Sequence, residues 1–313
     1  MENLVKELHA THERIAPHIH LTPVLTSRLI DEMANCQIFF KCENFQRMGA
    51  FKMRGAVNAI LQLPESKRTK GVVTHSSGNF AQALALAAKS VGVKAFIVMP
   101  ESAPQVKKDA VQGYGGEIIL CESTNEARQA TADKIAAETG ATFIHPSNDL
   151  DVILGQGTAA LELLKEYPDL EIILAPVGGG GLIAGTAIAA KTVQPNCTVI
   201  GGEPFEVDDA YQSLKAGKIV YNQTSNTIAD GLKTHLGDIN FPIIQEGVKS
   251  IIRVTEEEII AAMRIIWERM KIIVEPSCAV PLAAVLKERH HFENKKIGII
   301  LSGGNVDLAK LPF

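Results

Sequence analysis

The stretch from Glu171 to Gly185, E-I-I-L-A-P-V-G-G-G-G-L-I-A-G, holds the strongest structural signal in the chain. Residues 171–177 are apolar enough to form a strand that is buried on both faces. Four glycines follow at once, and an alanine-rich helical stretch begins at Leu182. Glycine leaves no side chain between backbone and ligand and permits unusual backbone angles, so successive N–H groups can point into one concavity. With the positive end of the next helix, this pattern predicts a cradle for a phosphate dianion.

Two other interpretations of this stretch stay open. The glycines could form an ordinary flexible loop, although they follow the strand without a break, which favours the cradle. The pattern Gly179-x-Gly181-x-x-Ala184, with Glu203 after the next strand, is also a relaxed match to a dinucleotide-binding fingerprint. That match predicts a nicotinamide-dependent oxidoreductase, but it is a single short motif that lies past the middle of the chain.

Length and composition exclude several classes of protein. At 313 residues and 46% hydrophobic, the chain can bury a large core divided into two lobes. A net charge of −4 gives no electrostatic basis for binding nucleic acid or an acidic membrane. No apolar run is long enough to span a bilayer, and the N-terminus has the pattern of an amphipathic helix rather than a signal peptide. Five widely spaced cysteines without a C-x-x-C pair predict reduced thiols in the cytoplasm.

Strands and helices alternate along most of the chain. Strands are expected at 37–42, 71–75, 94–99, 117–120, 142–145, 198–203 and 295–301, and helices from Phe51, after Asn79, at 104–114, at 123–139, at 155–166 and from Thr255 to Met270. Thr255 and Glu258 form a capping-box pattern, and Ser27 is expected to cap a short helix. The alternation predicts an α/β fold with parallel sheets wrapped by helices. We expect a smaller lobe, 70–148, inserted between the two parts of a larger lobe, 1–69 and 149–313.

Four polar or glycine-rich loops follow predicted strands, at 76–79, 178–181, 203–209 and 302–305. In parallel sheets, ligands bind at the carboxyl ends of the strands. The first loop, Ser76-Ser77-Gly78-Asn79, offers hydroxyls and N–H groups to a carboxylate, although ordinary helix capping would explain it as well. The acidic loop that contains Glu203, Glu206, Asp208 and Asp209 could hold Mg²⁺ or Ca²⁺ with help from a main-chain carbonyl, or it could simply be a solvated surface loop.

Lys52 follows Gly49-Ala50-Phe51 at the expected start of a helix. The helix dipole opposes a positive charge there, and burial would make the charged form costlier still. A lowered pKa would make Lys52 a nucleophilic amine suited to Schiff-base formation. On position alone, a solvated surface lysine is the alternative.

Taken together, the motifs resemble a known family. They are K-C-E-N-F-Q-R-M-G-A-F-K-M-R-G-A (41–56), S-S-G-N (76–79), G-Q-G-T (155–158), V-G-G-G-G-L (177–182), A-D-G (229–231) and S-G-G-N (302–305). In this order they are similar to the fold-type-II pyridoxal-phosphate enzymes, in the serine racemase and serine/threonine dehydratase branch. The resemblance covers essentially the whole chain and implies the two-lobed, three-layer parallel-sheet fold of the tryptophan synthase β-like enzymes.

The resemblance also implies roles for individual residues. Lys52 would carry the cofactor and act as a base, and Ser77 would be the acid or base on the opposite face of the substrate. The remaining cofactor contacts would come from Phe51, Asn79, Gly178, Gly179, Gly180, Gly181, Leu182 and Ser302. The substrate carboxylate would be held by Ser76, Ser77, Asn79 and Gln82. A structural divalent ion, Mg²⁺ or alternatively Ca²⁺ or Mn²⁺, would be bound by Glu203, the carbonyl of Val207, and Asp209.

The activity implied is that of a serine/threonine ammonia-lyase, which forms a 2-keto acid and ammonia, with serine racemase activity beside it. A serine at position 302, unlike an aspartate, would not keep the pyridine nitrogen protonated, which favours loss of a β-leaving group. threo-3-Hydroxyaspartate ammonia-lyase is an alternative in the same family, and the partner expected besides the substrate is a second copy of the chain. Cysteine synthases fit less well, because Met-Arg-Gly follows Lys52. A catalytically silent protein is disfavoured by the intact Lys52, Ser77 and Ser302.

Two positions depart from the family pattern. Phe80 stands where a histidine usually follows S-S-G-N, which leaves open both substrate preference and the balance of racemisation and elimination. Arg28 stands where nucleotide-activated racemases have a small polar residue, so the resemblance leaves stimulation by ATP open.

Overall fold

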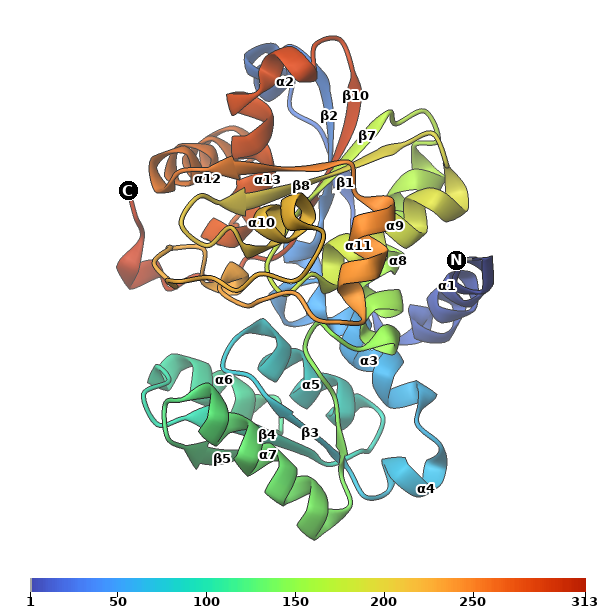
Figure 1. Ribbon diagram of the computed structural model, residues 1–313, viewed down its shortest axis with the longest axis vertical. Coiled ribbons are helices and arrows are strands. Elements are labelled where there is room, and N and C mark those ends of the chain that lie inside the picture. The colour runs from blue at the N-terminus through green and yellow to red at the C-terminus, as the bar shows by residue number, and fades with distance from the viewer. Residues whose placement is uncertain (1) are drawn as a thin grey trace.

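The computed structural model describes residues 2–313, and of residues 2 and 3 only the backbone. Its strands form two separate sheets, one in each lobe of the molecule (Figure 1). The larger sheet has the order β1-β2-β10-β7-β8-β9; β1 is antiparallel to β2, and the other neighbours are parallel. Its strands are β1 (Val24–Leu25), β2 (Gln37–Cys42), β7 (Ile172–Pro176), β8 (Thr198–Pro204), β9 (Ser250–Val254) and β10 (Lys296–Leu301).

The smaller sheet has the order β5-β4-β3-β6, and all of its pairs are parallel. Its strands are β3 (Val72–His75), β4 (Ala95–Pro100), β5 (Glu117–Cys121) and β6 (Thr142–Phe143). Parallel neighbours need crossover connections, and in both sheets helices provide them. The prediction of an α/β fold with parallel sheets wrapped by helices is therefore confirmed.

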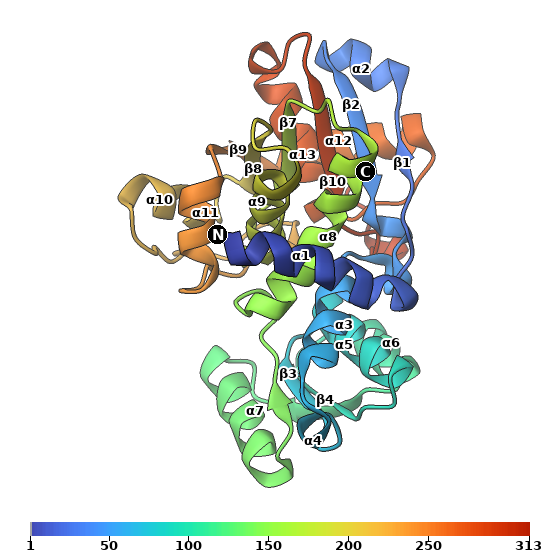
Figure 2. The ribbon, with the colours of Figure 1, turned by 90° about the vertical axis from the view of Figure 1, so that its right-hand side faces the viewer.

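Helices cover both faces of the larger sheet. One core lies between the sheet and α2 (Arg28–Ala34), α12 (Glu256–Met270) and α13 (Pro276–Lys287). The other lies between the sheet and α1 (Glu2–Ile15), α8 (Leu150–Glu166), α9 (Gly181–Val193) and α11 (Asn240–Gly247), and α1 lies across α8 and α9 (Figure 2). In β10, Ile299 faces the first core and Ile300 the second, which explains why this strand is apolar at successive positions.

The smaller lobe has its own core. It contains α5 (Asn79–Ser90), α6 (Gln105–Gly113) and α7 (Asn125–Thr139), which pack on the smaller sheet. The lobes are joined through α3 (Lys52–Gln62), which packs against α8 on one side and α5 on the other. The short helices α4 (Glu65–Arg68) and α10 (Asp209–Ala216) complete the set of α-helices in residues 2–313.

Some helices begin or end at the predicted residues, and others differ from the prediction by a few residues. The capping box of Thr255 and Glu258 is present at the start of α12, which ends at Met270 as predicted. α8 begins at Leu150, before the predicted Gly155, because the Asp149 carboxylate accepts the first free N–H groups of the helix at 2.9 and 3.2 Å. Ser27 precedes α2 but makes no capping hydrogen bond with its side chain, so that prediction is wrong.

Six of the α-helices and strands were not predicted: β1, α4, α10, α11, β9 and α13. In α13 the chain carries Pro276 in the first turn and Pro281 inside the helix. Proline suits a first turn but normally interrupts a helix interior, so the local sequence does not indicate a helix there. Within residues 2–313, no helix combines the length and the apolarity that crossing a membrane requires.

Candidate active site

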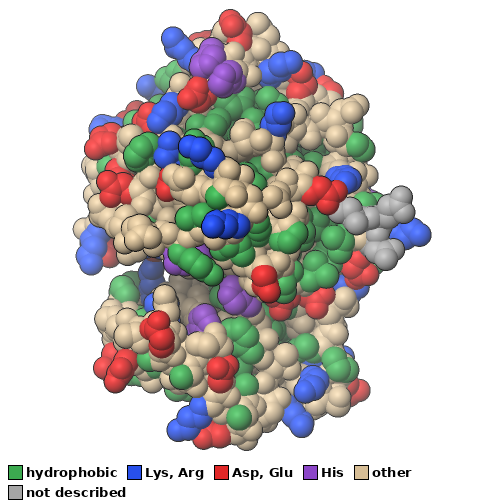
Figure 3. Space-filling model, in the orientation of Figure 1, with side chains coloured by type: hydrophobic (Ala, Val, Ile, Leu, Met, Phe, Trp, Pro, Cys, Tyr) green, Lys and Arg blue, Asp and Glu red, His purple; other side chains and the backbone are tan. Residues whose placement is uncertain are grey.

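The candidate site lies in the hollow between the two lobes, where histidine side chains line part of the wall (Figure 3). Lys52, the first residue of α3, donates a hydrogen bond from Nζ to the Pro146 carbonyl at 2.8 Å. Its Nζ lies 5.0 Å from the ring centre of Phe51 and 5.7 Å from that of Phe80. Burial lowers the pKa of Lys52 to about 8, partly opposed by Glu275. The predicted fall in pKa is confirmed, and about half of the amine is neutral near pH 8.

The glycine loop joins β7 to α9 and is buried along its whole length. Gly180 has a φ of +81°, a left-handed backbone conformation that glycine adopts at little energetic cost. A Cβ on Gly179 would clash with the Ser147 hydroxyl and lie 2.9 Å from Thr234 Oγ1. Asn240 holds the loop from behind by donating from Nδ2 to the Gly179 carbonyl at 2.8 Å. Two hydroxyls therefore face the loop, and neither Ser147 nor Thr234 was recognised from the sequence.

The other cofactor residues named from the sequence lie around this loop and the start of α3. Gly178 packs against Leu232, Gly181 is the first residue of α9, and Leu182 is the buried second residue. Ser302 is buried at the end of β10, and its carbonyl accepts a hydrogen bond from the Phe51 N–H at 3.0 Å. The S-G-G-N loop is thereby joined to the residue directly before Lys52.

Asn79 has its side-chain amide oriented by two partners far away in sequence. Its Nδ2 donates to both carboxylate oxygens of Glu275, at 2.9 and 3.1 Å, and its Oδ1 accepts from Asn305 Nδ2 at 2.9 Å. Glu275 is buried, and its pKa is raised to about 7 by burial and by the charge of Asp230. The sequence analysis did not single out Glu275, which lies directly before Pro276 in the first turn of α13.

The loop at residues 76–78 leads from β3 into α5, which begins at Asn79. Gly78 occupies the N-cap position, and no side chain caps the helix. Ser76 Oγ accepts from the Gly78 N–H at 3.4 Å, whereas no hydrogen bond of the Ser77 hydroxyl is seen within residues 2–313. Gln82 is buried on the first turn. Ordinary helix capping is therefore not what these hydroxyls do, and the start of α5 stays available to an anion.

His145 and His75 lie side by side near Lys52, with ring centres 6.2 Å apart. His145 Nδ1 accepts hydrogen bonds from the N–H groups of Ser147 at 3.1 Å and Asn148 at 2.8 Å, so its proton is on Nε2. Burial, followed by the charges of His75 and Lys52, lowers the pKa of His145 to about 4. His145 is consequently a neutral donor in this site, a role that its place at the end of the predicted strand 142–145 did not reveal; β6 itself ends at Phe143.

The acidic segment 203–209 is not simply a solvated surface loop, because the carboxylates of Glu203 in β8 and Asp209 at the start of α10 are buried. Glu203 accepts hydrogen bonds from the N–H groups of Ala210 at 3.0 Å and Tyr211 at 2.9 Å. Asp209 accepts from Asn222 Nδ2 at 2.7 Å and from the Leu236 N–H at 3.1 Å.

The rest of the acidic loop differs from Glu203 and Asp209. Val207, whose carbonyl was predicted as a metal ligand, lies between Glu203 and Asp209 in the sequence, and its side chain is buried. Asp208 instead pairs with Arg253 at 2.8 Å, and Glu206 is exposed.

Electrostatics make Glu203 and Asp209 suited to a cation. Burial, and then the charge of the neighbouring Asp209, raises the pKa of Glu203 well above its usual range. Burial likewise raises the pKa of Asp209 to about 7. In the described part of the chain, neither carboxylate forms an ion pair with a basic side chain. Two buried, uncompensated carboxylates are a donor set that fits a hard divalent ion.

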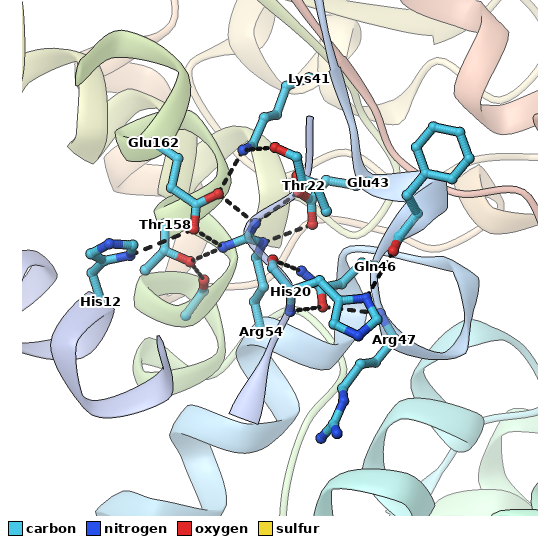
Figure 4. A network of polar contacts seen from close by, with 12 residues as sticks. His12, His20, Thr22, Lys41, Glu43, Gln46, Arg47, Arg54, Thr158 and Glu162 are labelled. Carbon is cyan, nitrogen blue, oxygen red and sulfur yellow. Dashed lines mark hydrogen bonds and ion pairs between the residues drawn. The ribbon is translucent and has the colours of Figure 1, made fainter. Parts of the chain in front are cut away.

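A buried network of charged side chains lies beneath the start of α3 (Figure 4). Arg54 donates to both oxygens of Glu43, at 2.7 and 2.8 Å, and to both oxygens of Glu162, at 2.7 and 2.8 Å. Lys41 Nζ lies 2.6 Å from Glu162 Oε2, and Thr22 Oγ1 donates to Glu43 at 2.6 Å. Two cations and two anions balance each other in charge inside the core.

This network connects three separate parts of the chain around the first turn of α3. Arg54 is fully buried two residues after Lys52, Lys41 and Glu43 are at the end of β2, and Glu162 is on α8. Burial would raise the pKa of Glu162, but Arg54 and Lys41 outweigh burial and hold that pKa below its usual range. Paired charges of this kind tolerate burial only while every partner is present.

A lysine of lowered pKa and a buried glycine loop, both between two parallel-sheet lobes, define an α/β enzyme that binds a phosphorylated carbonyl compound. Residues 15–303 match the family of pyridoxal-phosphate dependent enzymes. The chain therefore belongs to this family, as its motifs predicted.

Three similar proteins cover nearly the whole chain. The β-hydroxyaspartate dehydratase of Paracoccus denitrificans is 48% identical over 98% of this chain and 98% of its own length. The serine racemase of Dictyostelium discoideum is 50% identical over 98% of this chain and 96% of its own. A crystal structure of serine racemase from Dictyostelium discoideum has a TM-score of 0.93 at 51% identity and covers 97% of this chain and 99% of that one. The predicted two-lobed fold-type-II architecture is confirmed by this likeness.

The nicotinamide alternative loses its support. It needs Glu203 to be free to bind a ribose hydroxyl, whereas the Glu203 carboxylate is buried and accepts two backbone N–H groups. The family match also accounts for the motifs that this alternative left without a role.

Proposed function

We propose that this protein is a pyridoxal-phosphate-dependent ammonia-lyase that converts serine or threonine to a 2-keto acid and ammonia, with serine racemase activity beside it. The observation that carries the proposal is Lys52, whose pKa of about 8 makes part of its amine neutral in a cleft shared with the glycine loop and the S-S-G-N loop. The likeness to a serine racemase and a β-hydroxyaspartate dehydratase at about half identity supports the same reaction class.

The cofactor, when bound, supplies a carbonyl that links to amines and a ring that accepts electrons from the substrate Cα. Gly178, Gly179, Gly180, Gly181 and Leu182 would hold its phosphate with backbone N–H groups, and the hydroxyls of Ser147 and Thr234 would add two donors. Phe51 would pack on its ring and Ser302 would face its nitrogen. Asn79, oriented by Glu275 and Asn305, would bind its ring hydroxyl.

The substrate carboxylate would bind to Ser76, Ser77, Asn79 and Gln82 at the start of α5, where no side chain caps the helix. Lys52 would remove the Cα proton in its neutral form. For racemisation, Ser77 would return a proton from the opposite face. Residues 70–148 would act as a small mobile domain that closes over the cleft, and the ion pair of Lys107 and Asp230 across the lobes, at 2.7 Å, supports closure.

We also propose that Glu203, the Val207 carbonyl and Asp209 hold a structural divalent ion, Mg²⁺ or alternatively Ca²⁺ or Mn²⁺. Such an ion would compensate two buried carboxylates whose pKa values are raised. It would also fix the start of α10 and, through the Leu236 N–H bound to Asp209, the segment that packs on Gly180.

Removing this ion has a clear expected effect. EDTA should lower the melting temperature by several degrees, since an ion that binds only the folded state stabilises it by mass action. Mg²⁺ or Ca²⁺ should restore the original value. The measurement is a thermal melt of the holoenzyme with EDTA and after re-addition, with the double variant Glu203→Gln/Asp209→Asn as control. A shift of the same size in that variant would contradict the site.

A substrate panel separates the proposed reaction from its nearest alternative. L-Serine, D-serine, L-threonine and threo-3-hydroxyaspartate should be incubated with the enzyme, and keto acid and enantiomer measured together. We expect keto acid from L-serine and L-threonine and inversion of serine. A kcat/KM for threo-3-hydroxyaspartate that exceeds those for serine and threonine by about tenfold or more would instead establish 3-hydroxyaspartate ammonia-lyase. Phe80 beside Lys52 and the similarity to β-hydroxyaspartate dehydratase favour including that substrate.

We further propose that the protein works as a cytoplasmic homodimer. All five cysteines are buried free thiols, which suits a reducing compartment. Leu21, Phe45 and Ile273 are exposed apolar residues on neighbouring segments: His20 contacts the Phe45 carbonyl, and Asn44 contacts the Ile273 carbonyl. Such a patch suits a subunit interface, and light scattering on the purified protein would refute the dimer if it gave the monomer mass.

A further inference from the structure

Outside the cleft and the acidic loop, one group of metal-ligating side chains converges at the end of α13. Glu288, His290 and His291 lie on and just before a 3₁₀ turn, Arg289–His291, that leads toward β10. Each of the three offers one ligand atom, and these atoms all lie within 4.8 Å of one another. In Figure 3, histidine side chains are exposed at the end of the molecule that lies farthest from the small lobe.

The distances suit an ion held between the three groups. His290 Nε2 and His291 Nδ1 each lie 3.7 Å from the same carboxylate oxygen, Oε2 of Glu288. Ligands at about 2.1 Å from one ion in tetrahedral geometry are separated by roughly 3.4 Å, so small side-chain rotations close the set. The two nitrogens are too far from the oxygen for good hydrogen bonds, which means that the groups do not already satisfy one another.

The surroundings leave the three ligand groups free to bind. Within residues 2–313, the side chains of Glu288, His290 and His291 accept or donate no hydrogen bond, and their close charged contacts are with each other. The nearby Lys287 is engaged elsewhere, 3.1 Å from Glu258 Oε2 and 2.9 Å from the Arg253 carbonyl. The positive charge of Lys287 is therefore partly compensated by Glu258 before any metal ion binds.

We propose that Glu288, His290 and His291 form a surface binding site for a borderline divalent transition-metal ion, Zn²⁺, Co²⁺ or Ni²⁺. Two imidazoles and one carboxylate select these ions over Mg²⁺ and Ca²⁺, which prefer all-oxygen ligands. The site is thus chemically distinct from the oxygen site proposed at Glu203 and Asp209. Its remaining coordination positions open toward water and toward a groove of about 500 Å³ that Glu288 and His291 also line.

The test uses untagged holoenzyme in excess Mg²⁺, so that hard oxygen sites are occupied. Isothermal titration with Zn²⁺ should show one site, and Co²⁺ should give visible ligand-field absorption while the cofactor absorption stays unchanged. The double variant His290→Ala/His291→Ala should abolish both signals. Glu288→Gln should weaken Zn²⁺ binding by at least about tenfold, since even lost outer-shell partners cost that much. His9→Ala/His20→Ala, which removes two histidines elsewhere, should bind like the parent.

These variants separate the outcomes cleanly. The two histidine side chains are 66% and 64% exposed, so their replacement should leave the melting temperature and the turnover of serine unchanged. Unchanged Zn²⁺ affinity in the His290→Ala/His291→Ala variant would overturn the proposal, because the ion would then be bound elsewhere. Competition between Zn²⁺ and Mg²⁺ for one site would overturn it as well.

Discussion

Lys52→Ala should abolish the absorption band of the lysine-linked cofactor and lower turnover of L-serine by roughly 10⁴-fold or more. General acid–base catalysis by one side chain alone contributes about 10²–10⁴-fold, and the covalent link to the cofactor is lost as well. Lys52 reaches the cleft from the first turn of α3, and burial lowers the pKa of its amine. Absorption spectra of the purified variant and single-turnover assays measure the two effects.

The control for this variant is Lys67→Ala, which removes an exposed lysine from α4. It should keep both the absorption band and the turnover of the parent enzyme. A thermal melt of Lys52→Ala should show a folded protein, because the amine makes one hydrogen bond, to the Pro146 carbonyl, and loses little when it is removed. An absorption band that persists in Lys52→Ala would place the cofactor on another amine and overturn the proposed function.

Arg54→Met should have the largest effect on stability. Arg54 is fully buried and donates to both Glu43 and Glu162, so its loss leaves two buried carboxylates, of which Glu162 keeps Lys41 and His12 beside it. Breaking a buried ion pair by removing one partner costs about 3–5 kcal/mol. We therefore expect the free energy of unfolding to fall by about that amount, measured by urea denaturation of the holoenzyme.

The chain offers a matched control in Arg264→Met. Arg264 forms an ion pair with Glu268 on α12, where the two side chains are 61% and 46% exposed. Exposed pairs of this kind contribute about 0–1 kcal/mol, so the same chemical change there should barely alter unfolding. Equal losses in both variants would show that the buried network does not hold the start of α3 and that an arginine-to-methionine change is costly for another reason.

Much of the fold could be predicted because its signals are local. Short stretches of sequence are enough to recognise the apolar run before the glycines and the capping box at Thr255 and Glu258. The same holds for the alternation of strands and helices. α13 was not predicted because it contains two prolines, which normally disfavour a helix; its packing in the core stabilises the helix despite them. α8 was placed too late because its start depends on the Asp149 cap rather than on periodicity.

Much of the candidate site was also accessible from local motifs, but its supporting residues were not. Lys52, the glycine loop and the S-S-G-N loop each stand in a recognisable stretch. Glu275 meets Asn79 across 196 positions in the chain, and no short pattern records such a contact. The hydroxyls of Ser147 and Thr234 reach the glycine loop from segments whose own sequences suggest nothing about phosphate.

The amino-acid sequence by itself determined the family, the strand–glycine–helix unit and the identity of the reactive amine. It could do so because backbone propensities and the periodicity of apolar residues are properties of short stretches of sequence. Only the tertiary structure decided which charges share the core beneath α3, why Glu203 and Asp209 are buried, and which side chain orients Asn79. Those features depend on distances between segments far apart along the chain, and the packing of two lobes around one cleft sets these distances.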